Sequence, residues 1–223
     1  MNAAVGQSLP IAVGVMVSPL PVVAVILMLV SGRARANAVA FVGTWFVAIG
    51  ALTLAVALVA GTATGDGGSS SGSGWGEVVL GVVLLLLAVR RWRGRPRHGA
   101  EPEPPPRWMA AVDGFTPLRA AGLAVLLAVV NPKNLVLCLS GGAAIATAAP
   151  DDVSAAVVAA VVFAVVATIG VAAPVVVYLT TGDRAEAILA DLKTWMVEHN
   201  AVIMAVLLLV IGAKLVGDGM SML

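Results

Sequence analysis

Six long apolar segments dominate the hydrophobic pattern of the chain and alternate with short polar stretches. They cover roughly residues 8–31, 36–61, 76–92, 118–147, 153–180 and 200–217. A helix that crosses the hydrocarbon core of a bilayer needs about 17–25 predominantly apolar residues. The Val, Ile, Leu and Ala runs are too long for buried strands and show no alternation, so they predict helices. The expected fold class is therefore an all-α membrane protein with six transmembrane helices.

The amino-acid composition supports this interpretation and excludes several other classes. Of the 223 residues, 60% are apolar and 11% are charged, whereas soluble domains are about 45–50% apolar and about 25% charged. A soluble enzyme and a disordered chain are both excluded by these values. The single cysteine, Cys138, lies within an apolar run, which excludes a disulfide scaffold.

Positive charge is concentrated in alternate gaps between the apolar segments. Eleven of the 13 Lys and Arg residues lie in or at the edge of the first, third and fifth gaps, and the second and fourth gaps contain none. The positive-inside rule assigns the basic gaps to the cytoplasm. We therefore expect a multi-pass protein of the plasma (inner) membrane with both termini outside. No Lys or Arg precedes Arg33, which favours an uncleaved first span over a signal peptide.

The pattern divides the chain into three parts. Residues 1–92 form the first three-helix repeat, residues 93–117 a cytoplasmic loop rich in Arg and Pro, and residues 118–223 the second three-helix repeat. Apolar residues on one helical face predict an interfacial helix at about 183–197. The arginines of the loop either bind membrane lipids with anionic headgroups or act only as determinants of topology.

Two interruptions occur at matching places in the two repeats. Residues 18–21 (Ser-Pro-Leu-Pro) align with residues 131–134 (Asn-Pro-Lys-Asn), and residues 81–90 align with residues 205–214. Each repeat has three spans, so the second must cross the membrane in the opposite direction. The prediction is an inverted 3+3 repeat with broken first and fourth helices, an architecture typical of secondary transporters.

Prolines produce both helix breaks, and the breaks lie at similar depth. Pro19, Pro21 and Pro132 remove backbone donors from their spans. Pro19 is 14 residues and Asn131 is 12 residues from the nearest predicted cytoplasmic arginine. At about 1.5 Å per residue these separations correspond to about 21 Å and about 18 Å, near the middle of the membrane. Unwound backbone at that depth must face protein or a wet cavity. A purely structural role for the proline kinks is the alternative.

Lys133 is the one charge deep within a predicted span, and an ionisable residue there indicates a functional site. Because no Asp or Glu lies deep in a span, three states are open: the lysine pairs with an anionic substrate, bonds helix-end carbonyls, or is neutral. Asn131, Asn134 and Ser18 add polar groups that can cap the broken helices. We expect these four residues to bind a phosphate, sulfate or carboxylate group.

Several short motifs resemble those of a known family. They are residues 18–21, 33–37 (Arg-Ala-Arg-Ala-Asn), 114–118 (Gly-Phe-Thr-Pro-Leu), 131–134 and 209–212 (Leu-Val-Ile-Gly). With these motifs the chain resembles the glycolipid-addressing (GAP) proteins, which include the sulfolipid-addressing proteins, within the LysE superfamily of exporters. The resemblance implies a plasma-membrane protein that delivers glycolipids or related envelope lipids to the cell surface. The functional core that it implies comprises Pro19, Pro21, Asn131, Pro132, Lys133 and Asn134.

Our leading hypothesis is an exporter of glycolipid or a related anionic envelope lipid that works by alternating access, with Lys133 on the headgroup. The alternatives are a LysE-like exporter of a small anionic or zwitterionic solute such as an amino acid, and an accessory scaffold of a lipid-export complex. A lateral opening between helices would favour the lipid, and a closed aqueous vestibule the solute.

No enzymatic activity is expected, because the sequence has no HExxH or GxSxG motif. No catalytic residue, cofactor, metal or nucleic acid is expected either. The two histidines, His98 and His199, lie in or at the edge of predicted loops, away from any intramembrane carboxylate cluster. A homo-oligomer or association with lipid-export machinery is compatible with the sequence.

Overall fold

The protein is described by a computed structural model that covers residues 2–64, 71–94, 112–150, 152–221 and 223, and these residues are folded almost entirely into helices. The helices are α1 (Asn2–Met16), α2 (Pro19–Leu29), α3 (Ala34–Thr64), α4 (Ser71–Arg93), α6 (Pro117–Val125), η2 (Leu126–Val130), α7 (Pro132–Ala148), α8 (Val153–Thr180) and α9 (Ala185–Ser221). Two short 3-10 turns, η1 (Val112–Gly114) and η3 (Gly182–Arg184), precede α6 and α9.

The predicted all-α fold with broken first and fourth helices is confirmed. Three helices, α3, α8 and α9, are long and apolar enough to cross a membrane. The α1–α2 pair is bent by 54°, and α6 with η2 is bent by 66° against α7. Counting each bent pair as one span gives up to five spans among the described residues. The third predicted span is a helix of 23 residues, α4, whose membrane crossing stays a prediction.

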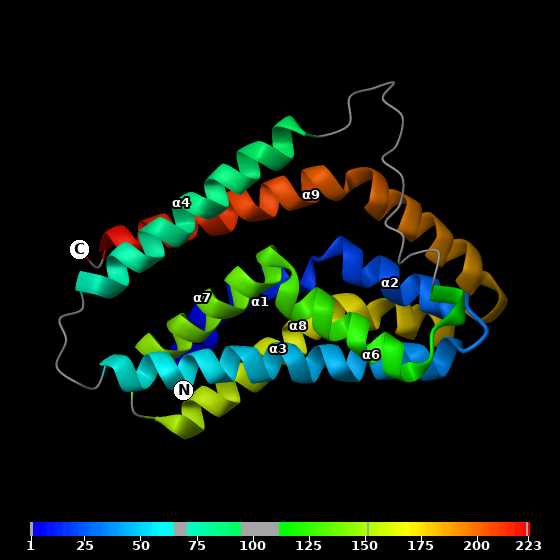
Figure 1. Cartoon of the computed structure of the whole chain (residues 1–223), viewed down its shortest axis with the longest axis horizontal. Helices are drawn as coiled ribbons and strands as arrows, with labels where there is room; N and C mark the ends of the chain where they lie inside the picture. The colour runs from blue at the N-terminus through cyan, green and yellow to red at the C-terminus, as the bar shows by residue number, and fades with distance from the viewer. Residues whose placement is uncertain (1, 65–70, 95–111, 151, 222) are drawn as a thin grey trace.

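The second span of each repeat packs against the broken helix of the other repeat. The long helix α3 packs on α6 and α7 of the second repeat, and α8 packs on α1 and α2 of the first. The remaining counterparts, α4 and α9, pack against each other. Figure 1 shows that α3 and α8 run in opposite directions, as do α4 and α9. An inverted repeat requires this arrangement, and it brings the two helix breaks into the same region of the bundle.

The chain termini and the basic connections lie at opposite ends of the molecule. In Figure 1 both termini are at one end, and the α2–α3 connection and the α8–α9 turn are at the other. Arg33, Arg184 and, in the first turn of α3, Arg35 lie at this second end. The assignment of that end to the cytoplasm stays a prediction of the positive-inside rule. Most of the Arg- and Pro-rich loop, residues 95–111, lies outside the described residues.

Two expected helix boundaries differ from those in the structure. The separate helix at about 183–197 is instead the first part of α9, which continues without interruption to Ser221. No Gly or Pro occurs between Ala185 and Ile211 to end the helix. In addition, α4 begins at Ser71 within a Gly/Ser stretch, because α9 packs against its first turns. A Cβ at Gly74 would lie 2.9 Å from the Gly219 carbonyl oxygen, so small residues allow this close approach.

Helix α7, which carries Lys133, is held against α3 by a similar contact. A Cβ built at Gly142 would lie 2.7 Å from the Thr53 carbonyl oxygen and 2.6 Å from the Val56 Cβ. Neither a backbone oxygen nor a branched carbon can move away easily. The position of the fourth span therefore depends on the missing side chain at residue 142.

We predict that Gly142→Ala destabilises the protein by about 1–3 kcal/mol through overpacking. Gly122→Ala on α6 is the matched control, since a Cβ there meets nothing within 4 Å and alanine is the better helix former. Thermal unfolding in detergent micelles should show a lower midpoint for the first variant and an equal or higher midpoint for the second. Equal midpoints for the two variants would contradict the proposed α3–α7 contact.

Candidate functional site

Both helix breaks consist of one or two non-helical residues followed by a proline. Ser18 has an extended backbone (φ −120°, ψ 99°), and α2 begins at Pro19. Asn131 is extended in the same way (φ −66°, ψ 115°), and α7 begins at Pro132. Each of these prolines therefore starts a helix, at the position that tolerates it best. Pro21 falls in the first turn of α2, where its missing N–H would have no intrahelical partner.

Lys133 links the two breaks. Its Nζ donates to the Val17 carbonyl oxygen and to the Ser18 Oγ, both at 2.8 Å. The Ser18 Oγ lies 2.6 Å from the Val15 carbonyl oxygen and 3.1 Å from the Asn134 Oδ1. The structure thus brings Ser18, Lys133 and Asn134 together from opposite repeats, as expected from the sequence.

The two asparagines complete the hydrogen bonds of the second break. The Asn134 Nδ2 donates to the Leu127 carbonyl oxygen at 3.0 Å. Leu127 lies in η2, a π-helical turn that ends at the break. The Asn131 side chain accepts from the Lys133 backbone N–H at 3.2 Å and so caps α7. Because such groups cannot bond water in the membrane interior, the polar side chains here stabilise the two unwound segments.

The lysine is enclosed and has a partial negative charge beside it. Lys133 is 4% exposed, Ser18 2% and Asn134 0%. The ion pair within the described ranges joins Lys214 and Asp218, near the C-terminus, whereas Lys133 bonds the Val17 carbonyl oxygen at the end of α1. A helix C-terminus carries about half a negative charge. The structure therefore contains the expected bond to a helix-end carbonyl, and the binding of an anionic substrate stays a prediction.

Sequence reasoning did not single out three buried polar residues that are spread along α3. The Asn37 Oδ1, Trp45 Nε1 and Thr53 Oγ1 atoms are buried without a hydrogen-bond partner in the described part of the chain. The Thr53 hydroxyl lies beside the Cys138 thiol, a weak hydrogen-bonding group, but outside hydrogen-bonding geometry. The only sequence signal is a spacing of eight residues, which is too common in an apolar helix to single them out.

Other hydroxyls in the spans show how unusual Thr53 is. Ser140 and Thr168 each donate to the carbonyl four residues earlier, at 2.9 and 2.6 Å, which is the usual arrangement for helical hydroxyls. Unpartnered buried polar atoms are costly and uncommon in native proteins. Packing alone therefore does not explain these three polar residues of α3.

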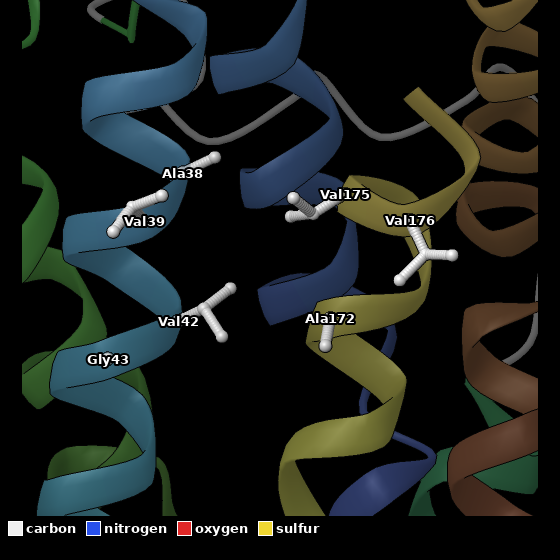
Figure 2. Close-up of a pocket in the computed structure, with 7 residues that line it drawn as sticks. All are labelled: Ala38, Val39, Val42, Gly43, Ala172, Val175 and Val176. Atoms are coloured by element: carbon white, nitrogen blue, oxygen red, sulfur yellow. The ribbon is translucent and has the colours of Figure 1, made fainter. Parts of the chain in front are cut away.

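An apolar groove lies between α3 and α8. Its volume is about 340 Å³. Figure 2 shows side chains of α3 and α8 facing each other across it. The groove is open to the surroundings and is lined by Ala38, Val39, Val42, Gly43, Ala172, Val175 and Val176. The groove thus opens on the surface of the bundle between two helices, and the residues of the Lys133 cluster are not part of its lining.

The fold and the linked breaks define a multi-pass, all-helical membrane protein of the broken-helix class. The family model described as "Sap, sulfolipid-1-addressing protein" matches residues 9–221. The chain therefore belongs to the sulfolipid-1-addressing protein family, which is an addressing family of membrane proteins and not an enzyme family. No curated protein and no solved structure shows significant similarity to the chain. Placement within the LysE superfamily stays a prediction.

We predict that the hydrogen bond between the two breaks is measurable by a double-mutant cycle. Ser18→Ala and Asn134→Ala should each lower the unfolding midpoint, with a coupling energy of about 0.6 kcal/mol and at most about 1.7 kcal/mol, the range for side-chain hydrogen bonds in membrane proteins. Ser140→Ala is the control, because its hydroxyl bonds only its own helix. Zero coupling would show that Ser18 and Asn134 do not interact in the folded protein.

Proposed function

We propose that the protein exports a glycolipid or a related anionic envelope lipid towards the cell surface by alternating access around the two linked breaks. The main support is the Lys133 cluster, a buried cation that joins two opposed repeats without an acidic partner among the described residues. The family name supports a sulfolipid as the lipid concerned. The residues proposed to contact the headgroup are Ser18, Asn131, Lys133 and Asn134, and Pro19, Pro21 and Pro132 keep the helices broken there.

The proposed mechanism depends on a change of hydrogen-bond acceptor at Lys133. In the structure the ammonium bonds the Val17 carbonyl oxygen, a neutral acceptor. A sulfate or phosphate oxygen is a stronger acceptor for the ammonium, because it carries a negative charge and adds an ion pair to the hydrogen bond. An anionic headgroup would therefore replace Val17 and loosen the link between the repeats. Binding can shift the equilibrium between two conformations only through such a difference in affinity.

The groove between α3 and α8 supports a lipid as the substrate. A polar headgroup needs a protein partner inside the membrane, whereas acyl chains can stay in the hydrocarbon. A sideways opening lets the two parts of one molecule occupy these two environments. A small solute such as an amino acid would need an aqueous vestibule instead, and an accessory scaffold would need partner proteins in order to move lipid.

We predict that Lys133→Ala abolishes export of a fluorescent sulfated glycolipid by the purified protein in proteoliposomes. Lys193→Ala on α9 is the matched control and should transport normally. If proton release by the lysine drives the cycle, Lys133→Arg should retain lipid binding but fail to turn over, since arginine keeps its proton.

Unimpaired export by both Lys133 variants would remove this residue from the mechanism. The same assay distinguishes the alternatives: lipid movement by the purified protein alone excludes a scaffold role. Transport of amino acids without lipid movement would support the LysE-like solute exporter.

A further inference from the structure

A second, more polar hollow lies beyond the α3–α8 groove, about one turn further along α8. This hollow has a volume of about 500 Å³ and is lined by Thr180, Thr181, Arg184 and Ile188. Val176 of the groove and Thr180 of the hollow are four residues apart on α8, so they lie on the same helical face. One face of α8 therefore changes from apolar to polar within one turn, as a binding site for an amphiphile would require.

The hollow offers a cation and two acceptor oxygens. The Thr180 and Thr181 hydroxyls donate to the Val176 and Val177 carbonyl oxygens at 2.8 Å, so their own oxygens can accept hydrogen bonds from a ligand. Arg184 is exposed, and its planar guanidinium matches the oxygens of a sulfate or phosphate group. An anionic sugar provides both groups, an oxyanion for the arginine and hydroxyls for the threonines.

The turn between α8 and α9 keeps the arginine next to the threonines. Gly182 has a left-handed backbone (φ 55°), which glycine adopts at little cost. The Arg184 N–H then bonds the Thr181 carbonyl oxygen at 3.2 Å. On the opposite wall, Arg35 precedes Val39 by one turn of α3, so the groove has basic residues on both walls at the same end. Glu186 lies two residues after Arg184 and reduces the net positive charge there. Recognition of the anionic sugar would therefore depend on the geometry of the guanidinium group and not on net charge.

We propose that the groove and the hollow together form a lipid-loading site for an anionic glycolipid, separate from Lys133. One acyl chain occupies the groove between α3 and α8, and the sulfated or phosphorylated sugar contacts Arg184, Thr180 and Thr181. The lipid comes from the leaflet at the Arg-rich end of the molecule, which the positive-inside rule assigns to the cytoplasm. This inference rests on the proposed function, because it supplies the step before the headgroup reaches Lys133.

The test is photolabelling of the full-length protein in phosphatidylcholine nanodiscs. The probe is a sulfogalactosyl lipid with a diazirine in its acyl chain, and the comparison is the neutral galactosyl lipid with the same chain. Labels should map to peptides that contain residues 38–43 or 172–176. Arg184→Gln should reduce labelling by the sulfated probe roughly tenfold, the effect of losing one charge-assisted contact, and should leave the neutral probe unchanged.

A second variant fills the groove itself. Gly43 lines the groove, and a Cβ there meets nothing within 4 Å, so Gly43→Leu adds a side chain that begins in open space. It should reduce labelling by both probes about tenfold. Arg119→Gln and Gly122→Leu are matched controls on α6, where both residues are exposed, and they should label as the unaltered protein does.

Labelling outside the groove, or equal labelling of Arg184→Gln by the sulfated probe, would overturn the loading site. The readout does not require transport, so the two proposals can fail separately. Normal labelling in a protein that moves no lipid would refute export and support the loading site. Unchanged export by both Arg184→Gln and Gly43→Leu would refute the loading site and support export through another route.

Discussion

The hydrocarbon interior of a membrane offers no hydrogen-bond partner to unwound backbone, and this constraint governs the centre of the protein. Two helices break there, and each break leaves carbonyl oxygens without an intrahelical donor. The protein satisfies them with side chains from both repeats: Lys133 bonds Val17, and Asn134 bonds Leu127. The prolines at the helix starts reduce the problem further, because they have no N–H to satisfy.

The same solution couples the two repeats at one buried point. The contacts between Lys133, Ser18 and Asn134 cross from the second repeat to the first, whereas the long helices meet through apolar and small residues. Helices that meet through dispersion contacts can slide past each other from one packing to a related one. A hydrogen bond in hydrocarbon, in contrast, can break without a large cost only if another hydrogen bond replaces it. A conformational change at the breaks therefore requires a replacement acceptor, and an anionic headgroup is the replacement that the lysine would bind best.

Much of this arrangement follows from the sequence, because its signals are local. Proline positions predict the breaks, and the only deep charge identifies Lys133 as the centre of the site. The sequence does not reveal that the ammonium bonds the end of α1, since that contact depends on how the repeats dock. The continuous α9, the early start of α4 and the α3–α8 groove were missed for the same reason. Each is determined by residues distant in sequence, such as Gly219 against Gly74.

Helix α3 connects the two proposed lipid contacts, because it forms one wall of the groove and also packs on α7. It also carries buried polar atoms of Asn37, Trp45 and Thr53 that have no hydrogen-bond partner among the described residues. A helix selected only for stability would have apolar residues at these positions, since an unsatisfied buried polar group costs about 1–3 kcal/mol. Proteins retain such groups mainly where function needs them. These three side chains are fully buried, so a headgroup could reach their free atoms only if the packing around α3 opened.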